Sequence, residues 1–292
     1  MNEPLTPIFR FPDDSPFRNI FIKREDLSET GSHKFRYLKS QMKALKEQVI
    51  QRVVLSTTGN VGISASHYGK KLGIEVVCLM SDKGDMDRAA QVEKEGGLLI
   101  LSSRPKRFAQ YLSRKYEVPL LRASREEDSL EGYRSLGQEL IHQVPDAQAV
   151  VNFATSGTSS MGLLKAYEGK RSPALHIVHD EDHSIVRGEE LAELVEQSGG
   201  AFHTVSKGEQ EAAEKTLAEY GLETSYEGIA SFAAALKIMD RYSSIVVIFS
   251  GKKWPAAEIT SKYKANTLEE VDKLFVVTSA GSVHAFRPEG TK

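Results

Sequence analysis

The sequence predicts an α/β protein of two lobes, each a three-layer αβα arrangement around a mainly parallel sheet. The chain has 292 residues, which suits two α/β lobes of roughly 100–200 residues each. Short runs rich in Val, Ile and Leu alternate with longer segments of helical period, a pattern typical of strands connected by crossover helices. Two such lobes imply a cleft between them.

The composition is that of a folded globule, with 40% hydrophobic and 27% charged residues. A formal charge of −2 provides no basic excess to attract nucleic acid or anionic lipid. The single cysteine, Cys78, has no partner for a disulfide, and no Cys/His spacing predicts a metal site. The start of the sequence lacks a signal-peptide pattern, and no run of about eighteen apolar residues occurs. We expect a cytoplasmic protein that binds neither nucleic acid nor a membrane.

Strands are predicted where short apolar runs end in turn residues. These runs are Ile20–Ile22, Val53–Leu55, Glu75–Met80, Leu98–Leu101, Ala149–Phe153, Leu175–Val178, Phe202–Val205, Ile245–Phe249 and Leu274–Val277.

Helices are predicted between these runs, and the clearest begins at Phe35. Its apolar residues Phe35, Leu38, Met42 and Leu45 fall on one helical face. Further amphipathic stretches cover Gly62–Leu72, Asp87–Glu95, Lys106–Tyr116, Gly132–Gln143, Gly188–Gln197, Glu209–Tyr220 and Gly228–Arg241.

The proline turn Val144-Pro145-Asp146 is the predicted junction between the lobes, because it separates a predicted helix from a predicted strand. Residues 31–145 would then form a smaller lobe, and residues 1–30 and 146–292 a larger one.

Three loops rich in hydroxyl residues and glycine each follow a predicted strand: Ser56–Gly62, Thr155–Gly162 and Ser250-Gly251. Ligands of α/β sheets bind beyond the carboxyl ends of strands, where helix amino termini present free N–H groups. The loop Thr155–Gly162 has two interpretations: a phosphate site built from hydroxyls and N–H groups, or a Ser/Thr helix cap.

Several common catalytic motifs are absent from the sequence. It contains neither Gly-x-Gly-x-x-Gly nor a P-loop, which argues against dinucleotide and P-loop NTPase readings. It contains neither Gly-x-Ser-x-Gly nor His-Glu-x-x-His, which argues against serine hydrolases and zinc peptidases.

Lys34 follows the charged segment from Lys23 through Thr30-Gly31-Ser32 and opens the helix at Phe35. An ammonium at a helix amino terminus is disfavoured by a few tenths of a kcal/mol to about 1 kcal/mol, which favours the neutral amine. A neutral amine is what a Schiff base requires. The alternative is a solvated lysine in a polar turn.

The order of these segments resembles the tryptophan-synthase-β-like superfamily, fold type II of the enzymes that use pyridoxal 5′-phosphate. The threonine synthase, threonine dehydratase and O-acetylserine sulfhydrylase branches are the most similar. The resemblance runs from about Pro4 to about Gly251 and rests on five segments: Lys23–Lys34, Ser56–Ile63, Glu131–Glu139, Thr155–Gly162 and Ser250-Gly251.

The resemblance implies a role for each matched residue. Lys34 would carry the cofactor as a Schiff base and act as the catalytic base. Asn60 would bind the cofactor's 3′-oxygen, and Ser250 would face its pyridine nitrogen. His33 would either cap the phosphate or orient the turn. The phosphate loop would consist of Thr155, Ser156, Gly157, Thr158 and Ser159, and the substrate carboxylate loop of Ser56, Thr57, Thr58 and Gly59.

The implied protein is a cytoplasmic homodimer, a lyase or synthase that acts on a small amino acid by β-elimination or by β- or γ-replacement. A neutral serine at position 250 favours expulsion of a leaving group over transamination. A phosphorylated substrate would need cations, for which Lys23, Arg36, Arg88 and Arg134 are candidates; the alternative for these is a solvated face.

Two other functions stay open. The phosphate loop keeps only Gly157 in its centre, and Lys252-Lys253-Trp254 follows Ser250-Gly251, where the family has smaller residues. A protein that binds cofactor or ligand but has lost or altered turnover would fit these departures. A plain α/β sugar- or nucleotide-binding protein would use the hydroxyl loops without a Schiff base.

Overall fold

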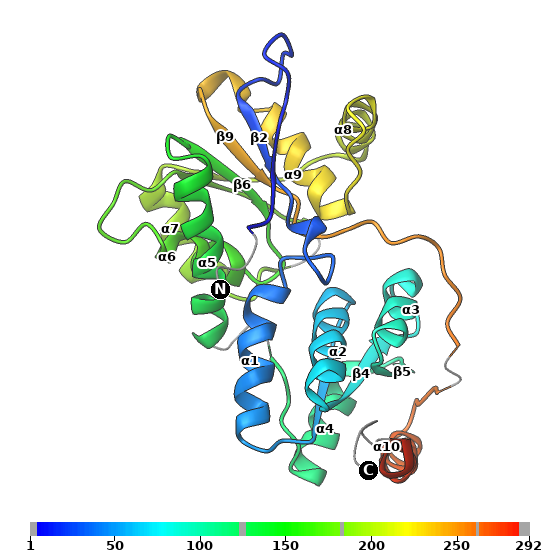
Figure 1. Cartoon of the computed structure of the whole chain (residues 1–292). Helices are drawn as coiled ribbons and strands as arrows, with labels where there is room; N and C mark the ends of the chain where they lie inside the picture. The colour runs from blue at the N-terminus through cyan, green and yellow to red at the C-terminus, as the bar shows by residue number, and fades with distance from the viewer. Residues whose placement is uncertain (1–4, 123–126, 182–183, 261–262, 286–292) are drawn as a thin grey trace, which may run out of the picture. The chain divides into compact units, whose positions relative to one another are not determined.

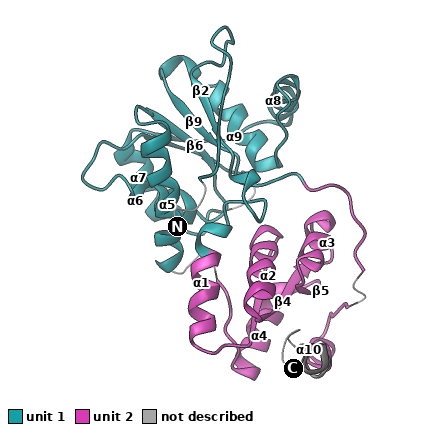
Figure 2. Ribbon diagram, in the orientation of Figure 1, with its two compact units in different colours: residues 1–37, 123–253 teal, residues 38–122, 254–292 magenta. Residues whose placement is uncertain are grey.

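The computed structural model describes residues 5–122, 127–181, 184–260 and 263–285. The chain divides into two compact units (Figure 2). Unit 1 comprises residues 1–37 and 123–253, and unit 2 comprises residues 38–122 and 254–292. These ranges differ from the expected lobes, which assigned residues 31–37 and 123–145 to the smaller lobe and residues 254–292 to the larger one.

Unit 1 contains a six-stranded sheet in the order β1-β2-β9-β6-β7-β8. All neighbouring strands are parallel except β1 and β2, which are antiparallel. The strands are β1 (Ile8–Arg10), β2 (Ile20–Lys23), β6 (Ala149–Phe153), β7 (Ala174–Val178), β8 (Ala201–His203) and β9 (Ile245–Ile248).

Helices cover both faces of this sheet (Figure 1). Alternate residues of β6 point to opposite faces: Val151 packs in a cluster with Phe232, whereas Val150 packs with Leu136 and Leu163. The helices of unit 1 are α5 (Glu127–Gln143), α6 (Thr158–Lys165), α7 (Gly188–Ser198), α8 (Lys207–Glu219) and α9 (Tyr226–Leu236), with the short 3-10 turns Glu25–Leu27 and Met239–Arg241.

Unit 2 contains a parallel three-stranded sheet in the order β3-β4-β5. The β4 residues Val77 and Leu79 pack in one cluster with Phe108 and Phe275. On the opposite face, a Cβ atom at Gly69 would lie 2.5 Å from Val76, so this glycine allows close helix-to-strand contact. The elements are β3 (Arg52–Ser56), β4 (Glu75–Ser81), β5 (Leu98–Ser102), α2 (Asn60–Leu72), α3 (Met86–Lys94), α4 (Pro105–Tyr116) and α10 (Leu268–Ala285), while α1 (Phe35–Glu47) begins in unit 1 and continues in unit 2.

The predicted α/β class with mainly parallel sheets and helices on both faces is confirmed, and eight of the predicted strands correspond to observed ones. The strand predicted at Leu274–Val277 is wrong, because these residues lie inside α10. The residues Val271 and Phe275 are buried in the core of unit 2, and a spacing of four residues is helical. The strand β1 and the helix α6 were not predicted.

Candidate active site

Lys34 lies at the end of a tight turn that leads directly into α1 in unit 1. Gly31 has a φ of +67°, a left-handed conformation that favours glycine. Around it, the Ser28 hydroxyl donates to the Ser32 carbonyl at 2.9 Å and accepts from the Ser32 amide at 3.0 Å. The helix begins at Phe35, so Lys34 immediately precedes its first residue, and its side chain is partly buried.

The same turn is hydrogen-bonded to the segment that follows β9. The His33 amide donates to the carbonyl of Ser250 at 2.9 Å, and the Lys252 amide donates to the carbonyl of Gly31 at 2.8 Å. Ser32 and Gly251 form an antiparallel bridge. Two predicted site residues that are far apart in sequence, Lys34 and Ser250, therefore belong to one hydrogen-bonded structure.

Thr224 and Ser225 bind the Ser250-Gly251 segment, and neither was among the predicted site residues. The Thr224 hydroxyl and the Ser225 amide both donate to the Gly251 carbonyl at 3.0 Å. The Thr-Ser pair directly precedes α9, with two residues between it and the start of the predicted helix Gly228–Arg241, and such residues favour helix starts.

His33 and Lys34 both contact Tyr133 of α5. The Lys34 Nζ lies 5.8 Å from the Tyr133 ring centroid, and the His33 ring meets it edge-on at 5.3 Å. Burial, followed by the charges of Lys34 and Arg36, lowers the pKa of His33 well below its ordinary value. Both ring nitrogens are buried and have no hydrogen-bond partner among the described residues.

The hydroxyl-rich loop after β6 ends at the amino terminus of α6. Gly157 precedes the helix with a φ of +81°, and no side chain caps it. The first N–H groups of an α-helix have no partner within the helix, and helix starts of this kind are suited to binding anions. Ser156 and Thr158 lie beside it with their hydroxyl oxygens 3.1 Å apart, and the first turn of α6 has no acidic residue.

Asn152 at the end of β6 fixes the first turn of α6, and the sequence analysis missed it. Its side-chain amide donates to the Ser159 hydroxyl at 3.2 Å and to the Ser160 hydroxyl at 2.9 Å. Because both hydroxyl oxygens accept from Asn152, their protons are left to donate elsewhere. The signal that sequence reasoning passed over is a polar residue in an otherwise apolar strand.

Close packing of α5 on α6 brings Tyr133 beside this loop. A Cβ atom at Gly162 would lie 2.6 Å from the Tyr133 Cβ, so only glycine fits there without displacing one helix. Since Tyr133 also contacts Lys34, α5 connects the lysine turn with the helix that follows the predicted phosphate loop.

The predicted asparagine loop lies in unit 2, between β3 and α2. The Thr57 hydroxyl accepts from the Gly59 amide at 3.0 Å and from the Gly62 amide at 3.3 Å, so it closes the loop. Gly59 has a φ of +140°, and a Cβ atom there would lie 2.5 Å from Arg88. Asn60 opens α2, and its Oδ1 is buried without a hydrogen-bond partner in the described part of the chain. Thr58 is exposed and Ser56 partly buried.

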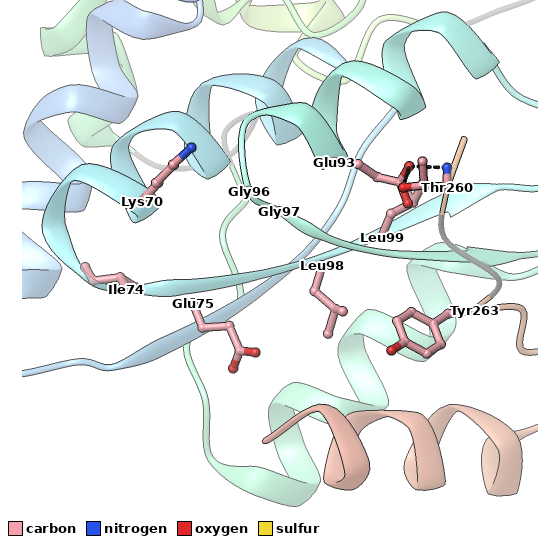
Figure 3. A pocket seen from close by; sticks show the side chains of 10 residues that line it. All are labelled: Lys70, Ile74, Glu75, Glu93, Gly96, Gly97, Leu98, Leu99, Thr260 and Tyr263. Carbon is pink, nitrogen blue, oxygen red and sulfur yellow. Dashed lines mark hydrogen bonds between the residues drawn. The ribbon is translucent and has the colours of Figure 1, made fainter. Parts of the chain in front are cut away.

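A separate cavity of about 550 Å³ lies in unit 2 (Figure 3). None of the predicted site residues lines it. Its walls are Lys70, Ile74, Glu75, Glu93, Gly96, Gly97, Leu98, Leu99, Thr260 and Tyr263, and the Thr260 amide donates to Glu93 at 2.8 Å.

A family model described as "Pyridoxal-phosphate dependent enzyme" matches residues 1–251 of the sequence. The chain belongs to this family. Pyridoxal 5′-phosphate is therefore its cofactor, as the resemblance of the motifs implied. The cofactor has a phosphate, an aldehyde and a ring nitrogen, which need an anion site, an amine and a polar partner. The uncapped end of α6, Lys34 and the buried Ser250 fit these three groups in that order.

Curated relatives of this pyridoxal-phosphate-dependent enzyme include two threonine dehydratase-like proteins. AKTS1-1 of Alternaria alternata, a threonine dehydratase-like protein, is 25% identical over 187 residues, which cover 62% of this chain and 46% of the relative. The chain thus spans less than half of that relative. The catabolic L-threonine dehydratase TdcB of Staphylococcus aureus (strain USA300) is 22% identical over 290 residues, which cover 93% of this chain and 81% of the relative.

Among solved structures, O-ureido-L-serine synthase superimposes on this enzyme with a TM-score of 0.74. The two share 18% sequence identity, and the match covers 85% of this chain and 89% of the other. This likeness shows a common fold.

Of the helices that the structure describes, none combines the length and the apolar character needed to cross a bilayer. Within the same residues, no three His, Cys, Asp or Glu side chains gather into a metal-binding group.

Proposed function

We propose that the protein catalyses β-elimination, or β- or γ-replacement, on a small amino acid. The observation that carries this proposal is the pair of hydrogen bonds that joins the Lys34 turn to the Ser250-Gly251 segment. When bound, pyridoxal 5′-phosphate supplies an aldehyde that condenses with amines and a ring that accepts the electrons left by the departing α-proton.

Lys34 has the two tasks of an amine in this chemistry. Its nitrogen would hold the cofactor, and its Nζ would remove the α-proton of the substrate as a general base. The side chain is partly buried, which supports this role, because desolvation favours the neutral form of an amine.

The amino terminus of α6 is the proposed anion site for the cofactor phosphate. The N–H groups of the first turn of α6 and the hydroxyls of Ser156, Thr158 and Ser159 would supply donors without a cationic side chain in the loop. These hydroxyls stand where related loops have additional glycines. Because the Ser159 hydroxyl oxygen accepts a hydrogen bond from Asn152, its proton is available to donate to the phosphate.

Ser250 is the proposed partner of the ring nitrogen. It is almost fully buried, with 4% of its surface exposed. A neutral hydroxyl does not stabilise a protonated ring nitrogen as a carboxylate does, so electron withdrawal is weaker. Weaker withdrawal favours rapid loss of a leaving group over the long-lived charge that transamination needs.

Asn60, Ser56, Thr57, Thr58 and Gly59 keep their proposed roles in binding the cofactor oxygen and the substrate carboxylate. The partnerless Asn60 Oδ1 supports the first role. The Thr57 hydroxyl oxygen already accepts two amides, which leaves its proton as the group that it offers to a carboxylate.

Two measurements test the proposal. The purified protein is incubated with pyridoxal 5′-phosphate and reduced with borohydride, and the labelled peptide is mapped; the label is expected on Lys34 and lost in Lys34→Ala. Lys43→Ala, which removes an exposed lysine of the same helix, is the matched control and should keep the label. A panel of amino acids is then assayed for ammonia and keto-acid release.

A protein that has kept the fold and lost turnover is the second candidate, favoured by the single central glycine of the phosphate loop. It predicts the same label on Lys34 without release of ammonia or exchange of the α-proton. Turnover of any member of the panel eliminates this candidate, whereas absence of the label contradicts both.

A further inference from the structure

A buried cluster of charged residues in unit 1 takes no part in the chemistry proposed above. It contains Lys23, Glu25, Arg36 and Glu139, whose side chains are 0%, 0%, 2% and 13% exposed. From the sequence, Lys23 and Arg36 were candidate ligands for a substrate phosphate, with a solvated face as the alternative. Both are instead enclosed and bonded within the protein.

Arg36 lies at the centre of this cluster. Its guanidinium binds Glu25 through two bonds of 2.7 Å, in the parallel geometry that arginine forms with carboxylates. Its Nη1 donates to Glu139 at 2.8 Å and to the Ser135 hydroxyl at 3.0 Å, and its Nη2 also reaches the Thr6 hydroxyl at 3.2 Å. So many planar bonds fix the orientation of the guanidinium, and lysine cannot reproduce them.

The cluster is charge-balanced. Glu139 accepts from Lys23 as well as from Arg36, so two carboxylates face two cations. Burial alone would raise the pKa of Glu139, but the bonds and charges of Arg36 and Lys23 outweigh it and leave that pKa below its ordinary value. Glu139 therefore stays ionised near neutral pH, opposite Arg36 and Lys23.

The Arg36–Glu25 pair closes the loop that carries Lys34. The two residues are eleven positions apart, and Lys34 lies two positions before Arg36. On its other side, the loop is bonded to Ser250 and Gly251 through His33 and Ser32. Lys34 is thus held between a buried ion pair and a backbone hydrogen bond.

We propose that Arg36, held by Glu25 and Glu139, is a positioning residue that fixes the direction of the Lys34 amine. This inference rests on the proposed function, because it assigns a task to the residue two positions after the proposed Schiff-base lysine. It concerns this chain's own side chains and holds for the protein with or without cofactor.

A stabilising role alone does not account for the cluster. Buried ion pairs add little to stability compared with apolar side chains of the same volume. Lys34 and Arg36 both act on the pKa of His33, so the field of the cluster reaches the residue next to the amine. Loss of one carboxylate would leave an uncompensated positive charge there, which disfavours a second ammonium at Lys34.

The test compares Arg36→Lys and Glu139→Gln with the wild type in the cofactor-free protein. Acetic anhydride labels lysines at a series of pH values, and mass spectrometry follows Lys34 relative to Lys43. In Glu139→Gln we expect the midpoint of Lys34 labelling to fall by about one pH unit. In Arg36→Lys we expect faster amide hydrogen exchange in the peptide that spans residues 28–35.

Arg52→Lys is the matched control, because Arg52 also forms a partly buried pair, with Glu75 at 2.5 Å, but lies in unit 2. It should change neither readout. With cofactor bound, Arg36→Lys is expected to lower kcat by roughly 10²-fold with a small change in KM, and to shift the pH titration of the visible absorbance.

Wild-type values of Lys34 labelling, hydrogen exchange and visible titration in both variants would overturn the inference while leaving the proposed function intact. Failure of the wild type to acquire a reducible bond at Lys34 would instead overturn the proposed function, and the inference with it. If a variant melts far below the wild type, the variant Glu139→Asp, which keeps the negative charge, is measured as well. A wild-type midpoint of Lys34 labelling in Glu139→Asp supports the positioning role, and a midpoint as low as that of Glu139→Gln contradicts it.

Discussion

At the scale of single residues, His176 forms the middle of a buried hydrogen-bonded chain in unit 1. Its two ring nitrogens contact His203 at 2.9 Å and the Tyr242 hydroxyl at 3.0 Å. Burial, together with the charges of His203 and Arg241, lowers the pKa of His176 to about 4 from an ordinary 6.5. The folded protein therefore holds this imidazole neutral.

This depressed pKa makes stability depend on pH. As the pH falls, His176 takes up a proton in the unfolded chain before it does so in the folded protein. Its contribution to the free energy of unfolding is therefore complete above about pH 6.5 and is lost as the pH falls toward 4. Between about pH 7.5 and about pH 5, the loss is on the order of 2 kcal/mol. Urea unfolding of His176→Gln should show a correspondingly flatter pH profile, whereas His142→Gln, at an exposed position, should follow the wild type. Parallel profiles for all three proteins would contradict the assignment.

Cys78 is buried in β4, and burial raises the pKa of its thiol to about 12. The thiolate, which is the reactive form, is therefore scarce at neutral pH. A disulfide reagent such as Ellman's should react with the native protein many times more slowly than with the same protein in guanidinium chloride, where one thiol per chain is expected. Rapid reaction in the native state would show that β4 opens.

The residue-scale predictions from sequence were most successful where chemistry is local. Lys34 directly before a helix and Cys78 inside an apolar strand both follow from neighbouring residues. The Arg36 cluster was not predicted, because Arg36 and Glu139 are 103 positions apart in the sequence. The role of Asn152 was not predicted either, because it depends on how the first turn of α6 is oriented relative to β6.

At the scale of elements, the contact between α5 and α6 depends on glycine. A Cβ atom at Gly137 would lie 2.7 Å from the Ala166 Cβ and would also press on the Leu163 carbonyl. Gly137→Ala should therefore push the helices apart and lower the free energy of unfolding by roughly 1–3 kcal/mol. It should also weaken the binding of pyridoxal 5′-phosphate, because α6 carries the proposed phosphate loop. Gly208→Ala in α8 is the control, since nothing lies within 4 Å of its Cβ position. Denaturant unfolding and cofactor titration measure both effects; equal behaviour of the two variants would contradict the packing argument.

The elements that sequence reasoning misassigned have definable causes. The run Leu274–Val277 has the apolar character of a strand, but Val276 and Val277 are exposed on α10 and only Phe275 is buried among these four. The helix α6 has eight residues, too few for a period to be read, and its Ser-rich start is typical of a loop. The strand β1 has three residues and lies at the edge of the sheet, where it pairs only with β2.

At the scale of the whole molecule, an exposed connection links residues 123–253 to the end of the chain. Residues 252–260 form neither helix nor strand, and Lys253 is 53% exposed. Limited trypsin treatment should cut after Lys252 or Lys253, because extended exposed backbone fits a protease. The fragment that begins near Trp254 should remain bound through Val271 and Phe275 and co-elute on gel filtration. The double variant Lys252→Ala, Lys253→Ala should lack this cut; early release of the fragment would contradict the packing of α10.

The chain order of the motifs, rather than any one motif, predicted the family and the fold. The boundaries of the units were harder to predict, because a proline turn at Pro145 separates two elements of the same unit. The helix before that turn packs on unit 1 through Leu136 and Leu140, and such long-range packing leaves no local trace in the sequence.

Unit 2 is built from two separated stretches of chain, and this has a consequence for its synthesis on the ribosome. The strands β3 to β5 and the helix α4 emerge early, whereas α10 supplies Val271 and Phe275 to the same core only near the end of translation. At about 5–20 residues per second, the nascent chain would wait on the order of ten seconds with this apolar surface open. Chaperones that bind exposed apolar segments would have their best opportunity during that interval.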